Sequence, residues 1–111
     1  MRKLLVALLM LPALAQAEFL TGNDLYTKLT SRDVGDRMYA LGYVVGVYDV
    51  NVHLTICPRS ESGITAGQVQ DITINYLAAN PGQRHRNAEV LVRDALRAIW
   101  PCANRNNKGS V

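Results

Sequence analysis

The chain has 111 residues, of which 49% are hydrophobic, and its formal net charge at pH 7 is +3. Two of those charges belong to Arg2 and Lys3, so the chain beyond its first residues carries only +1. Several arginines lie near the C-terminus, but acidic residues dilute them and no aromatic residues interleave as in nucleic-acid platforms. Length and charge therefore predict one small domain and exclude a nucleic-acid-binding protein.

The first 17 residues have the three parts of a secretory signal peptide. Arg2 and Lys3 give the positive start, residues 4–14 form the apolar run, and residues 15–17 read Ala-Gln-Ala, a small-x-small cleavage site. No cysteine follows the run, so nothing indicates a lipid anchor. We predict export and cleavage after Ala17, which removes 17 of the 111 residues and leaves 94. A domain of that size has a modest core.

The first predicted element of the mature domain is a short helix over residues 19–29. Thr21 or Asn23 can cap its N-terminus, and Leu25 and Leu29 are spaced to face a core.

The second predicted element covers residues 34–57 and organises the rest of the domain. Apolar residues recur there in steps of four and three, which is typical of a helix facing a core. These residues are Met38, Leu41, Val45, Tyr48 and Val52. From residue 48 to 56, however, apolar and polar residues alternate strictly, which is typical of a strand. The pattern alone leaves helix and strand open for residues 48–56.

Gly42 and Gly46 form a GxxxG pair on this element. Small residues four apart let another backbone approach closely, and in lipid this motif is a dimerisation face. The apolar run between Arg37 and Asp49 is too short to span roughly 30 Å of hydrocarbon. We therefore predict close helix packing at Gly42 and Gly46 inside a bundle that is not membrane-embedded.

Cys57 and Cys102 are the two cysteines of the chain. In an exported protein two cysteines usually pair, and a bridge closing about 45 residues contributes roughly 4 kcal/mol by chain entropy. Together with His53 and His85 they could instead form a zinc site, but the spacing matches no compact zinc module. A Cys/His nucleophile pair is disfavoured because a bridged sulfur cannot attack. We predict a disulfide, no metal and no cofactor.

Residues 58–64 form a short polar loop, and its four central residues have the most exposed character in the domain. We predict that they contact a partner: Arg59, Ser60, Glu61 and Ser62. Thr65 and Gln68 then fit a capping box for a helix that runs to Ala79. Its predicted buried residues are Val69, Ile72, Tyr76 and Leu77, and Asn80-Pro81-Gly82 ends it.

The last predicted helix covers residues 84–100, and Pro101 ends it. His85 falls in its first turn, and the residues at helical spacing toward the core are Ala88, Leu91, Val92, Ala95, Leu96 and Ile99. The final segment, residues 103–111, has nothing to bury and is predicted to be a flexible tail.

Several of these features, in this order and spacing, resemble the Rap/Tai family of type VI secretion immunity proteins. They are the glycine-spaced residues 41–47, Cys57-Pro58, the Thr65-capped helix with Gln68, Tyr76-Leu77, Asn80-Pro81, Arg84-His85, Ala88 and Trp100-Pro101-Cys102. The resemblance covers residues 19–102. The domain over residues 18–102 is therefore expected to be of the immunity type.

The resemblance implies an all-α domain, a small four- to five-helix bundle with one disulfide, often a homodimer. It implies a periplasmic protein that blocks a peptidoglycan amidase toxin by binding, with no catalytic residues of its own. It also favours helix over strand for residues 48–56. The contact role of residues 59–62 stays a hypothesis from exposure, because the family pattern does not place the toxin-binding residues.

Two other functions remain open. A periplasmic acid-stress chaperone would have a similar small, disulfide-linked helical fold, although the nine acidic residues of this chain are scattered without clusters. A secreted enzyme is the weaker alternative, because the sequence shows no phosphate-binding loop, no paired carboxylates and no free nucleophile with a base.

Overall fold

The computed structural model describes residues 19–60 and 62–103. The predicted signal peptide and residues 104–111 of the predicted tail lie outside these ranges. The helices of these residues are α1 (Gly22–Leu29), α2 (Val34–Asn51), α3 (Ala66–Ala79), the 3-10 turn η3 (Pro81–Gln83) and α4 (Ala88–Ile99). Within the described ranges the only β-type pairs are two isolated bridges. The predicted all-α fold is confirmed.

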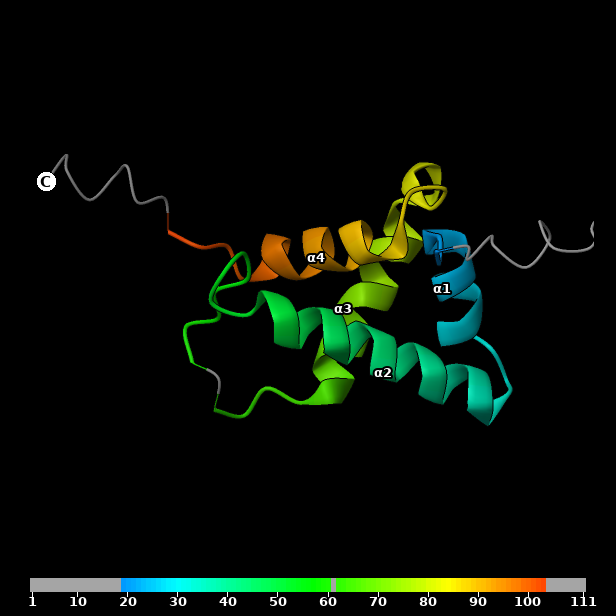
Figure 1. Ribbon diagram of the computed structural model, residues 1–111, viewed down its shortest axis with the longest axis horizontal. Helices are drawn as coiled ribbons and strands as arrows, with labels where there is room; N and C mark the ends of the chain where they lie inside the picture. The colour runs from blue at the N-terminus through cyan, green and yellow to red at the C-terminus, as the bar shows by residue number, and fades with distance from the viewer. Residues whose placement is uncertain (1–18, 61, 104–111) are drawn as a thin grey trace, which may run out of the picture.

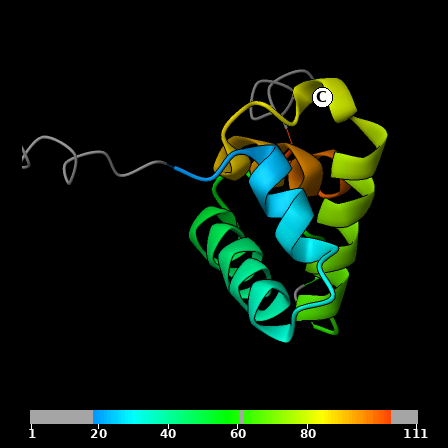
Figure 2. The same cartoon turned by 90° about the vertical axis from the view of Figure 1, so that its right-hand side faces the viewer.

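The α helices form one bundle in which each packs against the other three. In Figure 1, α2 and α4 run along two sides with α3 between and behind them, and α1 lies at one end. Figure 2 shows α1 crossing that end between α2 and α3. The loop from α2 to α3 and the end of α4 lie together at the opposite end (Figure 1). The largest fully buried apolar side chains are Leu25, Ile56, Leu77, Leu91, Leu96, Val44 and Val92.

The start of α1 is fixed by its cap and by the chain that precedes α4. The Thr21 hydroxyl accepts from the Asp24 N–H (3.2 Å), and the Asp24 carboxylate accepts from the Thr21 N–H (3.1 Å). Thr21, not Asn23, is therefore the cap. Gly22 is buried, and its N–H donates to the Arg86 carbonyl at 2.8 Å. A Cβ at Gly22 would lie 2.9 Å from the Arg84 carbonyl oxygen, so this close approach requires glycine.

The buried face of α2 differs from the predicted one. Its buried residues are Ala40, Val44, Val47 and Asn51, whereas Met38 is 57% exposed and Leu41, Val45 and Tyr48 are half-buried. The spacing was right but its phase was wrong, because α2 carries apolar residues on nearly every face and periodicity cannot choose among them. The buried Asn51 amide is satisfied, since it donates to the Val47 carbonyl at 2.8 Å.

Gly42 and Gly46 are exposed, and no heavy atom outside the helix backbone lies within 4 Å of a Cβ placed at either position. The predicted close packing of these glycines inside the bundle is therefore wrong. The two glycines instead leave the backbone of α2 exposed on the outer side of the helix.

Residues 48–56 are neither all helix nor strand. Helix α2 continues to Asn51, so the favoured helix is confirmed for residues 48–51 and wrong for 52–56. The chain then turns tightly: the Asn51 carbonyl accepts from the N–H groups of Leu54 (3.0 Å), Thr55 (3.0 Å) and Ile56 (3.2 Å). His53 takes a positive φ of 68° at the turn. This turn directs the fully buried Ile56 back into the core.

Helix α3 has the predicted capping box, with Gln68 N–H to Thr65 hydroxyl at 3.1 Å and Thr65 N–H to Gln68 side chain at 2.8 Å. Val69 and Leu77 are buried as predicted, but Thr73 occupies the buried position between them while Ile72 and Tyr76 are half-buried. The Thr73 hydroxyl donates to the Val69 carbonyl at 2.9 Å, which removes the cost of its burial.

Helix α4 begins at Ala88, four residues later than predicted, because η3 and a turn occupy the preceding residues and place His85 outside the helix. Its residues from Ala88 to Leu96 at the predicted spacing are buried. Ile99, the last residue of the predicted core face, is 56% exposed, so its predicted burial is wrong.

Candidate functional site

A disulfide joins Cys57, just after the α2 turn, to Cys102, just after α4. The two residues are 45 positions apart in sequence and their Cα atoms lie 4.8 Å apart. The predicted pairing is confirmed. Because both sulfurs are bonded to each other, neither is a free thiol for the alternative zinc site or for the alternative Cys/His nucleophile pair. The Cys57 N–H also donates to the Trp100 carbonyl at 2.9 Å. The covalent bond and the hydrogen bond together fix the α2–α3 loop against the end of α4.

The Trp100 ring, two residues before Cys102, is partly buried and packs against the hydrophobic core. It meets the Tyr48 ring edge to face, with centroids 6.2 Å apart. Trp100 thus links α2, the end of α4 and the loop at one point.

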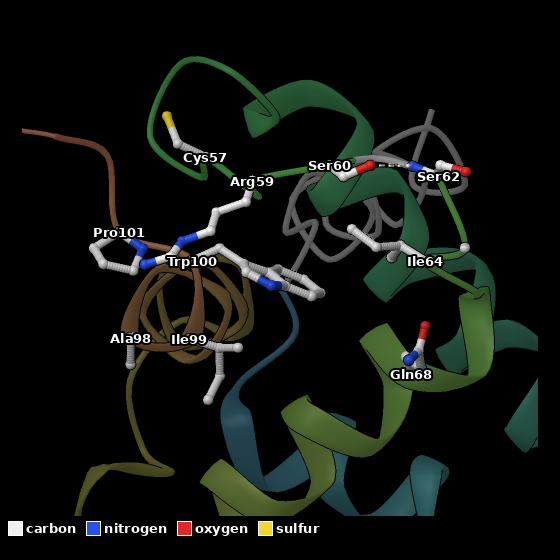
Figure 3. Close-up of a pocket in the computed structure, with 11 residues that line it drawn as sticks. Cys57, Arg59, Ser60, Ser62, Ile64, Gln68, Ala98, Ile99, Trp100 and Pro101 are labelled. Carbon is white, nitrogen blue, oxygen red and sulfur yellow. Dashed lines mark hydrogen bonds between the residues drawn. The ribbon is translucent and has the colours of Figure 1, made fainter.

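An open hollow of about 780 Å³ lies between the α2–α3 loop and the end of α4. Figure 3 shows Arg59, Ser60 and Ser62 on the loop side and Ala98, Ile99, Trp100 and Pro101 on the α4 side, with Ile64 and Gln68 completing the wall. The predicted contact residues Arg59, Ser60 and Ser62 are all exposed. The fourth, Glu61, lies outside the described residues.

The loop side of the hollow is ordered by local contacts. The Ser62 N–H donates to the Ser60 hydroxyl at 3.2 Å, and Gly63 takes a φ of 87° that suits glycine. Among the described residues that line the hollow, only Arg59 carries a formal charge. The described lining therefore offers the Arg59 cation, the hydroxyl groups of Ser60 and Ser62, and the exposed apolar side chain of Ile99.

Prediction from the sequence found the loop side of this hollow and missed the α4 side. The sequence pattern places Ile99 in the core because it continues the spacing of Val92, Ala95 and Leu96 on α4. One signal was available in the sequence. Ile99 stands two residues before Pro101, which ends the helix, so no further helical turn follows to pack beside the Ile99 side chain.

A second exposed surface, here called the α2 stripe, consists of Tyr39, Gly42, Gly46 and Val50. Tyr39 and Val50 are 56% and 71% exposed, and the two glycines have open space above them. A shallow hollow of about 390 Å³ beside the stripe includes both glycines, Tyr43 and Glu89 among its walls. Burial raises the pKa of Tyr43, and the negative charge of Glu89 raises it further.

Among the described residues, no helix combines the length and hydropathy that crossing a membrane requires.

The comparisons with known proteins assign the family. No curated protein matches the chain. The family model described as Rap1a immunity proteins matches residues 21–102, a range that includes α1 to α4 and both half-cystines. The match spans well over half of the 111 residues, and the chain therefore belongs to the Rap1a immunity proteins.

Proposed function

We propose that the protein is a periplasmic immunity protein that binds and blocks a cognate peptidoglycan amidase toxin of a type VI secretion system. The observation that carries this proposal is the Rap1a match over residues 21–102, because immunity proteins act by binding a toxin. The signal-peptide pattern of residues 1–17 and the Cys57–Cys102 disulfide both support an oxidising, extracytoplasmic compartment.

The protein acts by covering a surface rather than by a reaction. Loops held on a rigid scaffold commonly carry recognition, and the loop of residues 58–64 is held by the disulfide at Cys57 and by the start of α3. We assign toxin contact to Arg59, Ser60, Glu61 and Ser62. An interface of about 1,200 Å² in total or more is needed for a specific complex, so neighbouring surface must take part.

The test is neutralisation in the periplasm. Cells that export a peptidoglycan amidase, the one encoded beside this gene first, are co-transformed with this protein with or without residues 1–17. We expect rescue from lysis only with the exported form. Rescue by the form without its leader, or lysis with both forms for every amidase tried, would reject the proposal.

A loop variant tests the contact assignment. Replacing residues 59–62 by Ala or Gly should weaken binding of the purified toxin and leave the circular dichroism spectrum unchanged, because the described residues among them, Arg59, Ser60 and Ser62, are exposed. Unchanged affinity would reject the loop as the contact.

The proposal includes a homodimer, and the α2 stripe suits it. Tyr39 and Val50 stand at nearly equal distances on either side of the Gly42/Gly46 pair. A second copy related by a two-fold axis at the glycines would place Tyr39 against Val50 of its partner. Light scattering should give a dimer for the mature protein and a monomer for Gly46→Glu. A monomeric wild type would reject this part.

A further inference from the structure

Ile99 is an apolar side chain that the isolated chain leaves uncovered. It is 56% exposed, although it continues the buried face of α4 one turn beyond Leu96, which is fully buried. A single exposed isoleucine is ordinary in itself. Ile99, however, lies at the wall of the hollow together with Ala98, Trp100 and Pro101 (Figure 3). An apolar group from a partner could therefore be enclosed there.

Arg59 lies across the same hollow, and Figure 3 shows its side chain extending toward Trp100 and Pro101. No ion pair joins Arg59 to another described residue. A guanidinium in this position matches a carboxylate, which it can hold through two parallel hydrogen bonds. The arginines of the α4 region, in contrast, are paired: Arg86 and Arg97 lie 3.7 Å and 3.0 Å from Asp94, and Arg93 lies 3.2 Å from Glu89.

The two walls are fixed in relation to each other before a partner arrives. The Cys57–Cys102 bond and the hydrogen bond from the Cys57 N–H to the Trp100 carbonyl join the base of the loop to the end of α4. A partner that contacts both walls at once therefore causes a smaller loss of conformational entropy than a partner that must first order a free loop.

We propose that the toxin is bound by both walls of the hollow, with Ile99 as the apolar anchor and Arg59 as the charged contact. The occupant is a surface segment of the toxin that carries a carboxylate beside an apolar side chain. This inference rests on the proposed function. It adds the last turn of α4 to the interface and states the chemistry of the toxin segment that enters the hollow.

The experiment measures binding of the mature full-length protein to the purified amidase that it protects against, at several salt concentrations. The test variants are Ile99→Ser and Arg59→Gln. The matched controls are Val34→Ser, an exposed valine (61%) at the start of α2, and Arg32→Gln, an exposed arginine before α2. None of these side chains is buried, so we expect all four variants to fold. Thermal unfolding of each variant checks this.

We expect Ile99→Ser to weaken binding on the order of 30-fold, as for the apolar anchor of an interface. Arg59→Gln should weaken it on the order of tenfold and flatten the dependence of affinity on salt, because a charge pair is screened and an amide is not. Both controls should bind within about twofold of wild type, since surface side chains outside an interface contribute little.

Each other result decides against a stated part. If wild type binds and both test variants bind equally well, the inference is overturned while the proposed function stands. If Ile99→Ser weakens binding but Arg59→Gln keeps both affinity and salt dependence, the carboxylate assignment is overturned. If wild type neither binds an amidase nor rescues cells from one, the proposed function fails and the inference fails with it.

Discussion

Removing the disulfide by the double substitution Cys57→Ser and Cys102→Ser tests how the small domain is held together. Both residues are half-buried, so serine can replace them without an enclosed hydroxyl group. The core residues Leu25, Val44 and Leu91 come from α1, α2 and α4, and none of them is a half-cystine or its neighbour in the chain. We therefore expect the double variant to keep its helical content at about 20 °C while losing much of its stability.

The size of the loss follows from the loop that the bridge closes. The half-cystines are 45 positions apart, and the chain-entropy relation gives about 4 kcal/mol for a loop of that length. Small domains have only about 5 to 15 kcal/mol of stability in all. In a domain of this size 1 kcal/mol corresponds to about 4 to 8 °C in Tm, so the Tm should fall by about 15 to 30 °C.

Thermal unfolding followed by far-ultraviolet circular dichroism measures this loss. Dithiothreitol should lower the Tm of wild type to that of the double variant and leave the double variant unchanged. A fall of less than about 5 °C would refute the reasoning, because it would mean that the bridge hardly restricts the unfolded chain. A variant that lacks helical signal even at room temperature would refute the view that the core forms without the bridge.

Four smaller changes test other parts of the structure. Gly22→Ala should destabilise the domain by about 1 to 3 kcal/mol in urea unfolding, because its methyl group meets neighbouring backbone, whereas Gly67→Ala, in the open first turn of α3, should stabilise it by up to about 1 kcal/mol. Leu96→Ala should cost about 2 to 5 kcal/mol in the same assay, since Leu96 is fully buried. The backbone and hydroxyl of Thr21 lower the pKa of Asp24, so the ionised carboxylate stabilises the fold above its unfolded pKa near 3.8. That stability is lost as the pH falls through the lowered pKa, and Asp24→Asn should show a smaller change of Tm between about pH 5 and pH 2.

Local chemistry was readable from the sequence. The Thr65/Gln68 capping box depends on residues three apart, so the sequence contains all the groups involved. For α1 the sequence offered both Thr21 and Asn23 as the cap, and the structure selects Thr21. The disulfide was readable because a chain with only Cys57 and Cys102 offers one pairing. These features account for the correct prediction of the elements that bound the loop, whereas the all-α fold was implied by the family resemblance.

The orientation of α2 was not readable in the same way. Its residues are apolar around most of the helix, so two stripes one position apart fit a helical period equally well. The stripe that is buried, Ala40, Val44 and Val47, has the smaller side chains and packs beneath three other helices. Similarly, the alternation at residues 52–56 lacks a glycine or proline, so the turn at His53 had no sequence signal.

The hollow combines both cases. Its loop side follows from local polarity, whereas its α4 side depends on tertiary contacts: the Cys57–Cys102 bridge and the Cys57 N–H to Trp100 carbonyl hydrogen bond hold the loop of Arg59 against the end of α4 that carries Ile99. The same bridge therefore has two separable effects, one on the unfolded chain and one on the geometry of the hollow. At a temperature where the Cys-free double variant is still helical, its core is formed but Arg59 and Ile99 are no longer held in register. Toxin affinity should then fall while the helical signal stays constant. This result would mean that binding depends on the relative position of the two walls and not only on the folded helices.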